Sequence, residues 1–444
     1  MKRTFIIISL SLLTAISCKK EVTPIVIDAN SYHNAVDRLT SVIVHDIFSP
    51  PVASRIYAYS NIAAYEVMAQ QNDQYESLSG KVTGLGPAPV PREEINTEMA
   101  TLVAQIEIGK NLIFSEDKLI AYRDSLYSDW KTKNEDLFEA SRAYGMEMAD
   151  HIKAWMAKDN YKQTRTMPKF TVNSDEVSRW KPTPPMYMDG IEPHWSKIRP
   201  FVLDSAAQFK PVPHPDFSMD QNSDFYKELK EVFELGGGVN PEDRDPEHVE
   251  IAKFWDCNPY VSTTKGHLMF ATKKITPGGH WIGICKIACK TDGADFNKTV
   301  YAYTKTSIAL ADGFISCWDE KYRSNLIRPE TLINETMNEN WFPVLQTPPF
   351  PEYTSGHSVV SGAASVVLTQ IFGDDFHFVD DTELVYGLPI RTFDSFYQAS
   401  SEAAISRLYG GIHYRAAIDN GLIQGKLIGN YVASNLQMTA NETN

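Results

Sequence analysis

The chain contains 444 residues, of which 43% are hydrophobic and 22% are charged. These proportions are typical of a globular protein with a sizeable core, and they exclude a disordered or fibrous chain. The formal net charge of −14 argues against a nucleic-acid partner, because proteins that bind nucleic acids normally present a basic surface.

The N-terminus has the pattern of an export signal. Lys2 and Arg3 precede a short apolar run over residues 5–13, and small residues then lead to Cys18. The apolar run is too short to span a bilayer. Residues 1–18 resemble a bacterial lipoprotein signal peptide, which implies an exported protein held in the cell envelope by a lipid on Cys18, its only membrane contact. An ordinary signal peptide that contains a cysteine is the alternative.

Apolar residues at helical spacing predict a mainly α fold built from helical bundles, because alternating strand patterns are few. Residues 160–220 differ: eight prolines lie between Pro182 and Pro215, so this segment is predicted to be ordered but irregular. The predicted helices cover residues 31–48, 55–71, 93–113, 115–157, 222–235, 246–256, 303–322, 356–372, 399–409 and 416–436.

The signal peptide is followed by two predicted regions. Residues 19–298 form an N-terminal helical region that includes the proline-rich segment, and residues 299–440 form a helical catalytic domain. After the signal, no stretch of the sequence reaches the roughly 18 apolar residues that a membrane helix needs.

The cysteines after the signal do not form a zinc pattern. Cys285 and Cys289 would share a face of a helix, but further ligands at short spacing are missing from the sequence around them. We therefore expect buried thiols at Cys257, Cys285, Cys289 and Cys317, with a disulfide as the alternative in an oxidising compartment. The acidic residues within 374–383 could hold a cation, but we expect a solvated acidic loop.

Two cations stand seven residues apart in the last third of the chain. Lys321 and Arg328 would project from one face if a helix continued between them, and Pro329 would then end that helix. Two neighbouring cations require an anion or carboxylates between them. Taken alone, a solvated basic face is the simpler interpretation.

A second group, Ser355-Gly356-His357, precedes a run of small residues that predicts a tightly packed helix. Ser355 is a favourable N-cap, and Gly356 lets the backbone approach a ligand closely. The free N–H groups at a helix N-terminus can bind an anion. His357 beside them could give or take a proton near neutral pH.

A third group contains Arg407 and His413. The guanidinium of Arg407 suits a tetrahedral oxyanion, and Gly410 and Gly411 would interrupt the helix and turn His413 toward the same site. A single histidine is more often a core residue than a ligand. Together, however, the three groups supply what a phosphate-sized oxyanion needs beside acid–base or nucleophilic chemistry.

The order Lys-x6-Arg-Pro, Ser-Gly-His and Ser-Arg-x5-His resembles the signature of the phosphatidic acid phosphatase type 2/vanadium haloperoxidase superfamily. The signature covers about residues 312–425, and weaker similarity to the soluble haloperoxidase-like members extends upstream. The resemblance implies helical bundles and an oxyanion held by Lys321, Arg328, Ser355, Gly356 and Arg407. It also implies that His413 binds vanadium, or attacks phosphorus in a phosphatase, and that His357 is the acid–base group.

The chain departs from the family pattern at two positions. Thr354 replaces the usual proline, which we expect to alter only the entry turn. Ala417 stands where many members carry the aspartate that orients the histidine equivalent to His413. Asp312 and Asp319 are the alternatives, so the orienting partner of His413 stays open.

The resemblance leaves three functions open. The first is a haloperoxidase in which a vanadate cofactor activates hydrogen peroxide toward halide, with His280 and Trp281 as entrance residues or, preferably, a structural pair. The second is an acid phosphatase without a cofactor that hydrolyses phosphate esters through a phosphohistidine. The third is a surface protein that binds an oxyanion without catalysis.

Overall fold

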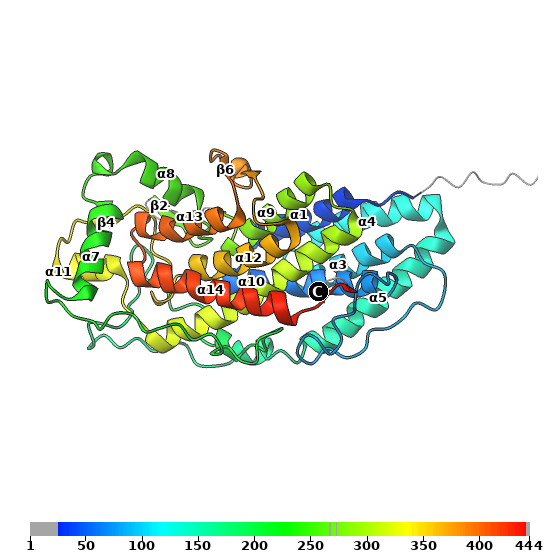
Figure 1. The fold of residues 1–444 in the computed structure, drawn as a ribbon, viewed down its shortest axis with the longest axis horizontal. Coiled ribbons are helices and arrows are strands. Elements are labelled where there is room, and N and C mark those ends of the chain that lie inside the picture. Colours follow the sequence, from blue (N-terminus) through cyan, green and yellow to red (C-terminus); the bar gives the residue numbers. More distant parts are fainter. Residues whose placement is uncertain (1–24, 266–267, 272, 441–444) are drawn as a thin grey trace, which may run out of the picture.

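The computed structural model describes residues 25–265, 268–271 and 273–440. The predicted signal peptide and Cys18 lie outside the described residues. The predicted mainly α fold is confirmed (Figure 1). The helices are α1 (Ala29–His45), α2 (Pro50–Ala69), α3 (Thr97–Leu112), α4 (Glu116–Lys133), α5 (Glu135–Met156), α6 (Tyr161–Thr164), α7 (Asp224–Leu235), α8 (Pro246–Phe254), α9 (Pro277–Asp292), α10 (Phe296–Ser324), α11 (Pro329–Thr336), α12 (Gly356–Phe372), α13 (Phe396–Tyr409) and α14 (Arg415–Asn435).

The strands within the described residues form short antiparallel pairs that connect helices. The pairs are β1 (Gly237–Gly238) with β4 (Phe342–Pro343), β2 (Ser262–Lys265) with β3 (Leu268–Ala271), and β5 (Phe378–Asp380) with β6 (Arg391–Phe393). Single 3₁₀ turns occur at Trp195–Lys197, Pro241–Asp243 and Leu384–Tyr386.

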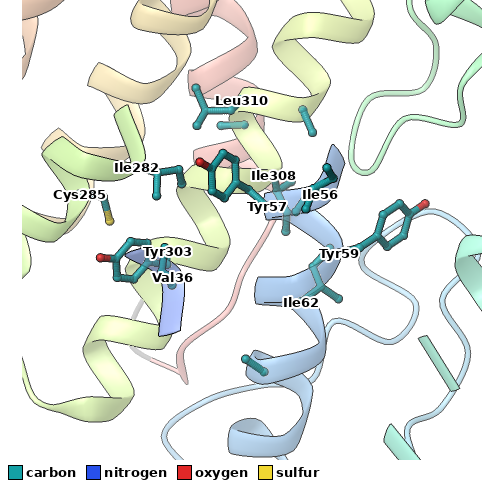
Figure 2. Packing of buried hydrophobic residues seen from close by; sticks show 14 of the residues in the cluster. Val36, Ile56, Tyr57, Tyr59, Ile62, Ile282, Cys285, Tyr303, Ile308 and Leu310 are labelled. Atoms are coloured by element: carbon teal, nitrogen blue, oxygen red, sulfur yellow. The ribbon is translucent and has the colours of Figure 1, made fainter. Parts of the chain in front are cut away.

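One apolar core joins the N-terminal helices to the C-terminal ones. Figure 2 shows Val36 of α1, Tyr57 of α2, Ile282 of α9 and Ile308 of α10 within this core. The long helix α10 packs against both α2 and α12, so the core includes residues on both sides of position 298. In Figure 1, α7, α8 and α11 gather at one end of the molecule, and α4 and α5 lie at the other.

A stripe of small residues brings α12 and α14 into close contact. A Cβ atom built on Gly425 would lie 2.0 Å from the carbonyl oxygen of Val359, and one built on Gly429 would lie 2.7 Å from that of Ala363. These approaches leave no room for a side chain. The tight packing predicted for the helix after Ser355 is therefore present.

The segment between Lys321 and Arg328 does not continue as a helix. Asn325 adopts the left-handed conformation, with φ of 50°, and α10 ends at Ser324. Arg328 occupies the N-cap position of α11, and Pro329 lies in its first turn. The prediction of one shared helix face is therefore wrong, because the proline begins a helix here instead of ending one.

Helix α9 was missing from the prediction, and residues 115–157 form two helices. Thr276 caps α9 and Pro277 occupies its first turn, which explains why the glycine-rich start is still helical. His280 and Trp281 are each 1% exposed, and Trp281 Nε1 donates to Ser361 Oγ at 2.7 Å. They form the structural pair that the sequence favoured.

The proline-rich segment is ordered and largely irregular, as predicted. The buried carboxylate of Asp312 accepts hydrogen bonds from the backbone N–H groups of Phe201, Val202 and Leu203 at 2.7, 2.8 and 3.1 Å. Helix α10 thereby holds the segment across one face of the bundle.

The described cysteines are free and buried, as predicted. The prediction of a solvated acidic loop is only partly correct, because Asp374 and Asp375 are exposed but Asp380 and Glu383 are buried. Within the described residues, no helix combines the length and apolar character that a bilayer crossing requires.

Candidate active site

Residues from the beginning of α12 and from the end of α13 onward meet at one cavity. Its walls include Gly356 and His357 at the beginning of α12, Arg407 near the end of α13, and His413 beyond it. Gly411 has a φ of 75°, a left-handed turn that glycine adopts without strain and that separates α13 from His413. The cavity has an empty volume of about 460 Å³, which includes space open to solvent.

His413 is held by a buried carboxylate that the sequence analysis did not identify. Its Nδ1 lies 2.8 Å from Oε1 of Glu352, which also accepts the backbone N–H of Tyr414 at 2.9 Å. Nε2 faces the guanidinium of Arg328, which can only donate, so Nε2 keeps its lone pair and the ring proton sits on Nδ1. That is the tautomer that a metal ligand or a nucleophile requires.

Arg328 faces the free nitrogen of His413. Its Nη1 lies 3.2 Å from Nε2 of His413 and donates to the carbonyl of Ile412 at 2.7 Å, while Nε donates to the carbonyl of Phe350 at 2.8 Å. Nη2 is buried without a hydrogen-bond partner among the described residues. Burial lowers the pKa of Arg328 to about 10, so the side chain stays charged at neutral pH.

The ammonium group of Lys321 donates hydrogen bonds to backbone carbonyl groups. Nζ donates to the carbonyls of Pro351, Glu352 and Thr354 at 3.1, 3.0 and 2.5 Å, which occupies the three donors of an ammonium group. Lys321 therefore fixes the loop before α12 and contributes positive charge near the site. Burial lowers its pKa to about 7.

The beginning of α12 follows the prediction. Ser355 is the N-cap, and its Oγ accepts the N–H of Ser358 at 3.3 Å. The backbone N–H of Ser355 donates to the carbonyl of Ala417 at 3.0 Å. The hydroxyl hydrogen of Ser355 remains for another acceptor, and the helix N-terminus adds a partial positive charge.

His357 lines the cavity from the first turn of α12. Its Nε2 is buried and has no hydrogen-bond partner among the described residues. Burial and the charge of Arg407 hold the pKa of His357 well below its usual value of 6.5. Burial and the charges of Arg328 and Lys321 lower the pKa of His413 in the same way. Both imidazoles are therefore neutral at neutral pH.

Arg407 is positioned by the segment after α8. Its Nη2 donates to the carbonyls of Trp255 and Ala252 at 2.7 and 3.2 Å, and Nε donates to Ser406 Oγ at 2.9 Å. Nothing in the sequence pattern linked residues 252–255 to Arg407. Burial lowers the pKa of this guanidinium, which increases the benefit of a neighbouring anion.

The rest of the cavity wall is mainly apolar. Phe350 lines the cavity and also contacts two cations, because its ring centroid lies 5.0 Å from both Lys321 Nζ and Arg328 Cζ. A wall of this kind keeps water away and strengthens the charge interactions inside. The apolar lining residues are Pro50, Pro259, Pro277, Phe314, Trp318, Pro348, Phe350 and Ile412.

The two acidic residues considered as partners of His413 are engaged elsewhere. Asp312 holds the proline-rich segment, and Asp319 pairs with Arg323 at 3.0 Å. Glu352 takes this role from the loop before α12. The signal available in the sequence was a single acidic residue inside the apolar stretch 348–353.

Thr354 does more than alter the entry turn. Its hydroxyl donates to Oε1 of Gln424 on α14 at 2.8 Å, and Gln424 Nε2 donates to Ser316 Oγ at 3.1 Å. The residue that replaces proline thus ties the oxyanion loop to two helices.

The site fits a tetrahedral oxyanion. Arg328 Nη2 is a buried donor without a partner among the described residues, and the charges of Lys321, Arg328 and Arg407 all act on His413. Unpaired buried donors are costly unless a ligand satisfies them. Vanadate, an anion with four oxygens, meets that requirement, and His413 Nε2 can ligate its metal.

Comparison with known proteins agrees with this geometry. A family model described as the VCPO second helical-bundle domain matches residues 334–442. The crystal structure of a bacterial vanadium-dependent iodoperoxidase aligns with a TM-score of 0.90 and 61% identity, covering 94% of this chain and 99% of that chain. A search of curated proteins gives no match.

A bacterial vanadium-dependent chloroperoxidase shares the fold. Its holo form aligns with a TM-score of 0.67 and 18% identity over 88% of this chain and 93% of that chain. Its apo form aligns with a TM-score of 0.63 and 15% identity over 88% of this chain and 95% of that chain. With the 61% identity to the iodoperoxidase, the chain belongs to the vanadium-dependent haloperoxidases of the phosphatidic acid phosphatase type 2/vanadium haloperoxidase superfamily, enzymes with a vanadate cofactor.

Proposed function

We propose that this haloperoxidase oxidises iodide with hydrogen peroxide at the cavity lined by His413 and His357. The choice of iodide rests on the 61% identity to a protein named as an iodoperoxidase. The observation that carries the assignment of the site is His413, whose unprotonated Nε2 faces a buried arginine at 3.2 Å. That arrangement suits a ligand to an anionic metal centre.

Several residues of this chain would hold vanadate together. His413 Nε2 would ligate the metal, while Arg328, Arg407, Ser355 and the N-terminus of α12 would bind the oxygens. Lys321 would act mainly through its charge, since its donors are on backbone carbonyls. Bound vanadate supplies Lewis-acid activation of hydrogen peroxide.

His357 is the group that moves a proton. Its Nε2 is unpaired and its pKa is depressed, so the neutral ring can accept a proton from hydrogen peroxide as the peroxide enters. The charge of Arg407 disfavours the protonated ring, so His357 passes the proton on readily. A polarisable halide can approach along the apolar wall that includes Trp318 and Phe350.

The test is halide oxidation by the purified protein, with and without added orthovanadate. We expect triiodide formation from iodide that requires vanadate and is lost in His413→Ala. The matched control is His377→Ala, because His377 is a surface histidine with a side chain 62% exposed. Bromide oxidation is measured as bromination of monochlorodimedone. A bromide turnover faster than that of iodide would overturn the iodide assignment.

The same preparation tests the other two functions. His413-dependent hydrolysis of a phosphate ester, without halide oxidation under any vanadate loading, would favour the acid phosphatase. Tight vanadate binding with neither reaction would favour the non-catalytic binder.

We also propose that Cys18 carries a lipid and anchors the exported enzyme in the cell envelope. The support is the sequence pattern of residues 1–18. In a bacterial host, the wild-type protein should partition with membranes and show a lipid-modified N-terminus by mass spectrometry. Cys18→Ser should abolish both, and a wild-type protein that begins elsewhere than at residue 18 would refute the proposal.

A further inference from the structure

A buried cluster beside the active site has no role in the chemistry described above. Cys257 follows α8, His280 lies on α9, and Glu383 lies in the loop between β5 and β6. Their exposed fractions are 1%, 1% and 2%. Cys257 also lines the active-site cavity, so the cluster adjoins the cavity wall at this residue.

We propose that Cys257, His280 and Glu383 bind a divalent transition-metal ion, with zinc as the best match. A thiolate, an imidazole and a carboxylate are the side chains that zinc prefers, and three protein ligands leave a fourth position for water. The three ligand atoms lie within 4.8 Å of one another.

The spacing of the three atoms matches the edges of a tetrahedral zinc site. His280 Nδ1 lies 3.5 Å from Cys257 Sγ and 3.3 Å from Glu383 Oε1, and the last two atoms are 3.8 Å apart. Usual zinc–ligand bond lengths at tetrahedral angles give edges of roughly 3.6 Å for N–S and O–S and roughly 3.4 Å for N–O. The 3.3 Å distance also exceeds that of a charge-assisted hydrogen bond, which is roughly 2.7–2.9 Å.

The surroundings of His280 resemble the outer shell of a metal site. Its Nε2 lies 2.8 Å from Oδ2 of Asp380, and Asp380 is fixed by Thr382, whose backbone N–H and hydroxyl donate to Oδ1 at 3.0 and 2.7 Å. A carboxylate that accepts the second ring N–H of a histidine fixes the tautomer and aims the other nitrogen at a metal. Here that nitrogen is Nδ1, which faces Cys257 and Glu383.

Charge supports the same conclusion. Asp380 and Glu383 place two buried carboxylates beside His280, and burying such charge is costly unless a cation compensates it. A divalent ion would do so at the centre of the three ligands. A proton on His280, shared with Asp380 and Glu383, is the competing arrangement.

The metal would support the oxyanion site through Trp255. The indole of Trp255 stacks on His280 with centroids 4.5 Å apart, and its carbonyl accepts from Arg407 Nη2 at 2.7 Å. The same carbonyl accepts the N–H of Cys257 at 3.0 Å. Ligation of Cys257 would therefore fix the segment that positions Arg407, so metal loss should weaken vanadate binding.

The test measures metal content in the full, tag-free chain. The protein is dialysed against zinc, freed of excess metal, and analysed by elemental mass spectrometry without vanadate. We expect about one zinc per wild-type chain and clearly substoichiometric zinc in Cys257→Ala and Glu383→Gln, because each variant loses one of the three ligands. Cys289→Ala is the matched control, because Cys289 is an equally buried thiol on α9, and it should retain the ion.

Cobalt loading provides a second readout that does not depend on activity. Tetrahedral Co²⁺ bound to a thiolate gives a sulfur-to-metal charge-transfer band, expected in the wild type and Cys289→Ala and missing in Cys257→Ala. Two results would overturn the proposal: wild-type protein without stoichiometric zinc after loading, or equal zinc in Cys257→Ala. The first would identify the cluster as a protonated histidine between carboxylates, and the second would place the ion elsewhere.

Discussion

His413 and Glu352 form a fully buried pair in which Nδ1 lies 2.8 Å from Oε1. The other oxygen of Glu352, Oε2, has no hydrogen-bond partner among the described residues, and burial raises the pKa of this carboxyl to about 8. Oε1 can accept the Nδ1–H of His413 whether Glu352 is ionised or carries a proton on Oε2. This one oxygen is thus enough to fix the tautomer of His413.

This relationship predicts different outcomes for two substitutions of Glu352. Glu352→Ala removes the acceptor of both His413 Nδ1 and the Tyr414 N–H, so kcat should fall roughly ten- to hundredfold. Glu352→Gln keeps a carbonyl oxygen at the position of Oε1 and should recover most of that loss. The measurement is vanadate-saturated halide oxidation together with the dissociation constant of vanadate.

Asp319→Ala is the control, because Asp319 pairs with Arg323 and not with the active site. It should leave kcat unchanged. If Glu352→Gln were as impaired as Glu352→Ala, the negative charge and not the acceptor geometry would be the contribution of Glu352. A folded Glu352→Ala protein with full activity would contradict the assignment altogether.

The sequence was sufficient to single out several residues that the structure then brings close together. Lys321, Arg328, His357 and His413 are charged or titratable residues within short motifs, and the two glycines at positions 410 and 411 predicted the turn before His413. Glu352 was not predicted as a site residue because a loop residue has no periodic pattern. Its proximity to His413 arises only from tertiary packing.

The errors in the helix prediction have a local cause. Asn325 can adopt the left-handed backbone, and this single residue ends α10 before Arg328. The sequence between Lys321 and Pro329 is otherwise compatible with a continuous helix. Likewise, Asn134 separates α4 from α5 by capping the second helix, a role that asparagine performs at no cost to the apolar pattern.

The depressed pKa of Lys321 predicts pH-dependent vanadate binding. Because burial lowers this pKa to about 7, the ammonium form dominates below that pH and the neutral amine above it. An anion binds the cationic form more tightly, so the dissociation constant of vanadate should rise as the pH increases from about 7.

Lys321→Met removes both the charge and its titration. Its vanadate affinity at pH 6 should be at least about tenfold weaker than that of the wild type, and the difference should shrink at higher pH. Vanadate also changes its own protonation, but this effect is common to both proteins and cancels in the ratio. A ratio that stays constant from pH 6 to 9 would show that Lys321 does not titrate near the site.

The hydroxyl of Thr354 should contribute to stability. Thr354→Val keeps the shape but leaves Oε1 of Gln424 without its donor, so the free energy of unfolding should fall by about 1–3 kcal/mol. Thr101→Val is the matched control, because Thr101 is also 0% exposed but its hydroxyl has no partner among the described residues. Denaturant unfolding should show no loss for Thr101→Val, and equal losses in both variants would contradict the role given to Thr354.

The packing of neighbouring helices against α12 predicts opposite effects for two glycine-to-alanine changes. A Cβ on Gly425 would lie 2.0 Å from the carbonyl oxygen of Val359, so Gly425→Ala must push the helices apart. Overpacking of this kind costs about 1–3 kcal/mol or more. Because α12 begins at the oxyanion site, the same variant should also bind vanadate more weakly.

Gly313→Ala on α10 is the matched comparison. The nearest side-chain atom to a Cβ on Gly313 is 3.7 Å away, an ordinary contact, and alanine is the better helix former by about 1 kcal/mol. Gly313→Ala should therefore unfold at an equal or higher denaturant concentration and keep its vanadate affinity. If Gly425→Ala were as stable as the wild type, α14 would have to move away from Val359 at no cost, and that result would contradict the close packing of α12 against α14.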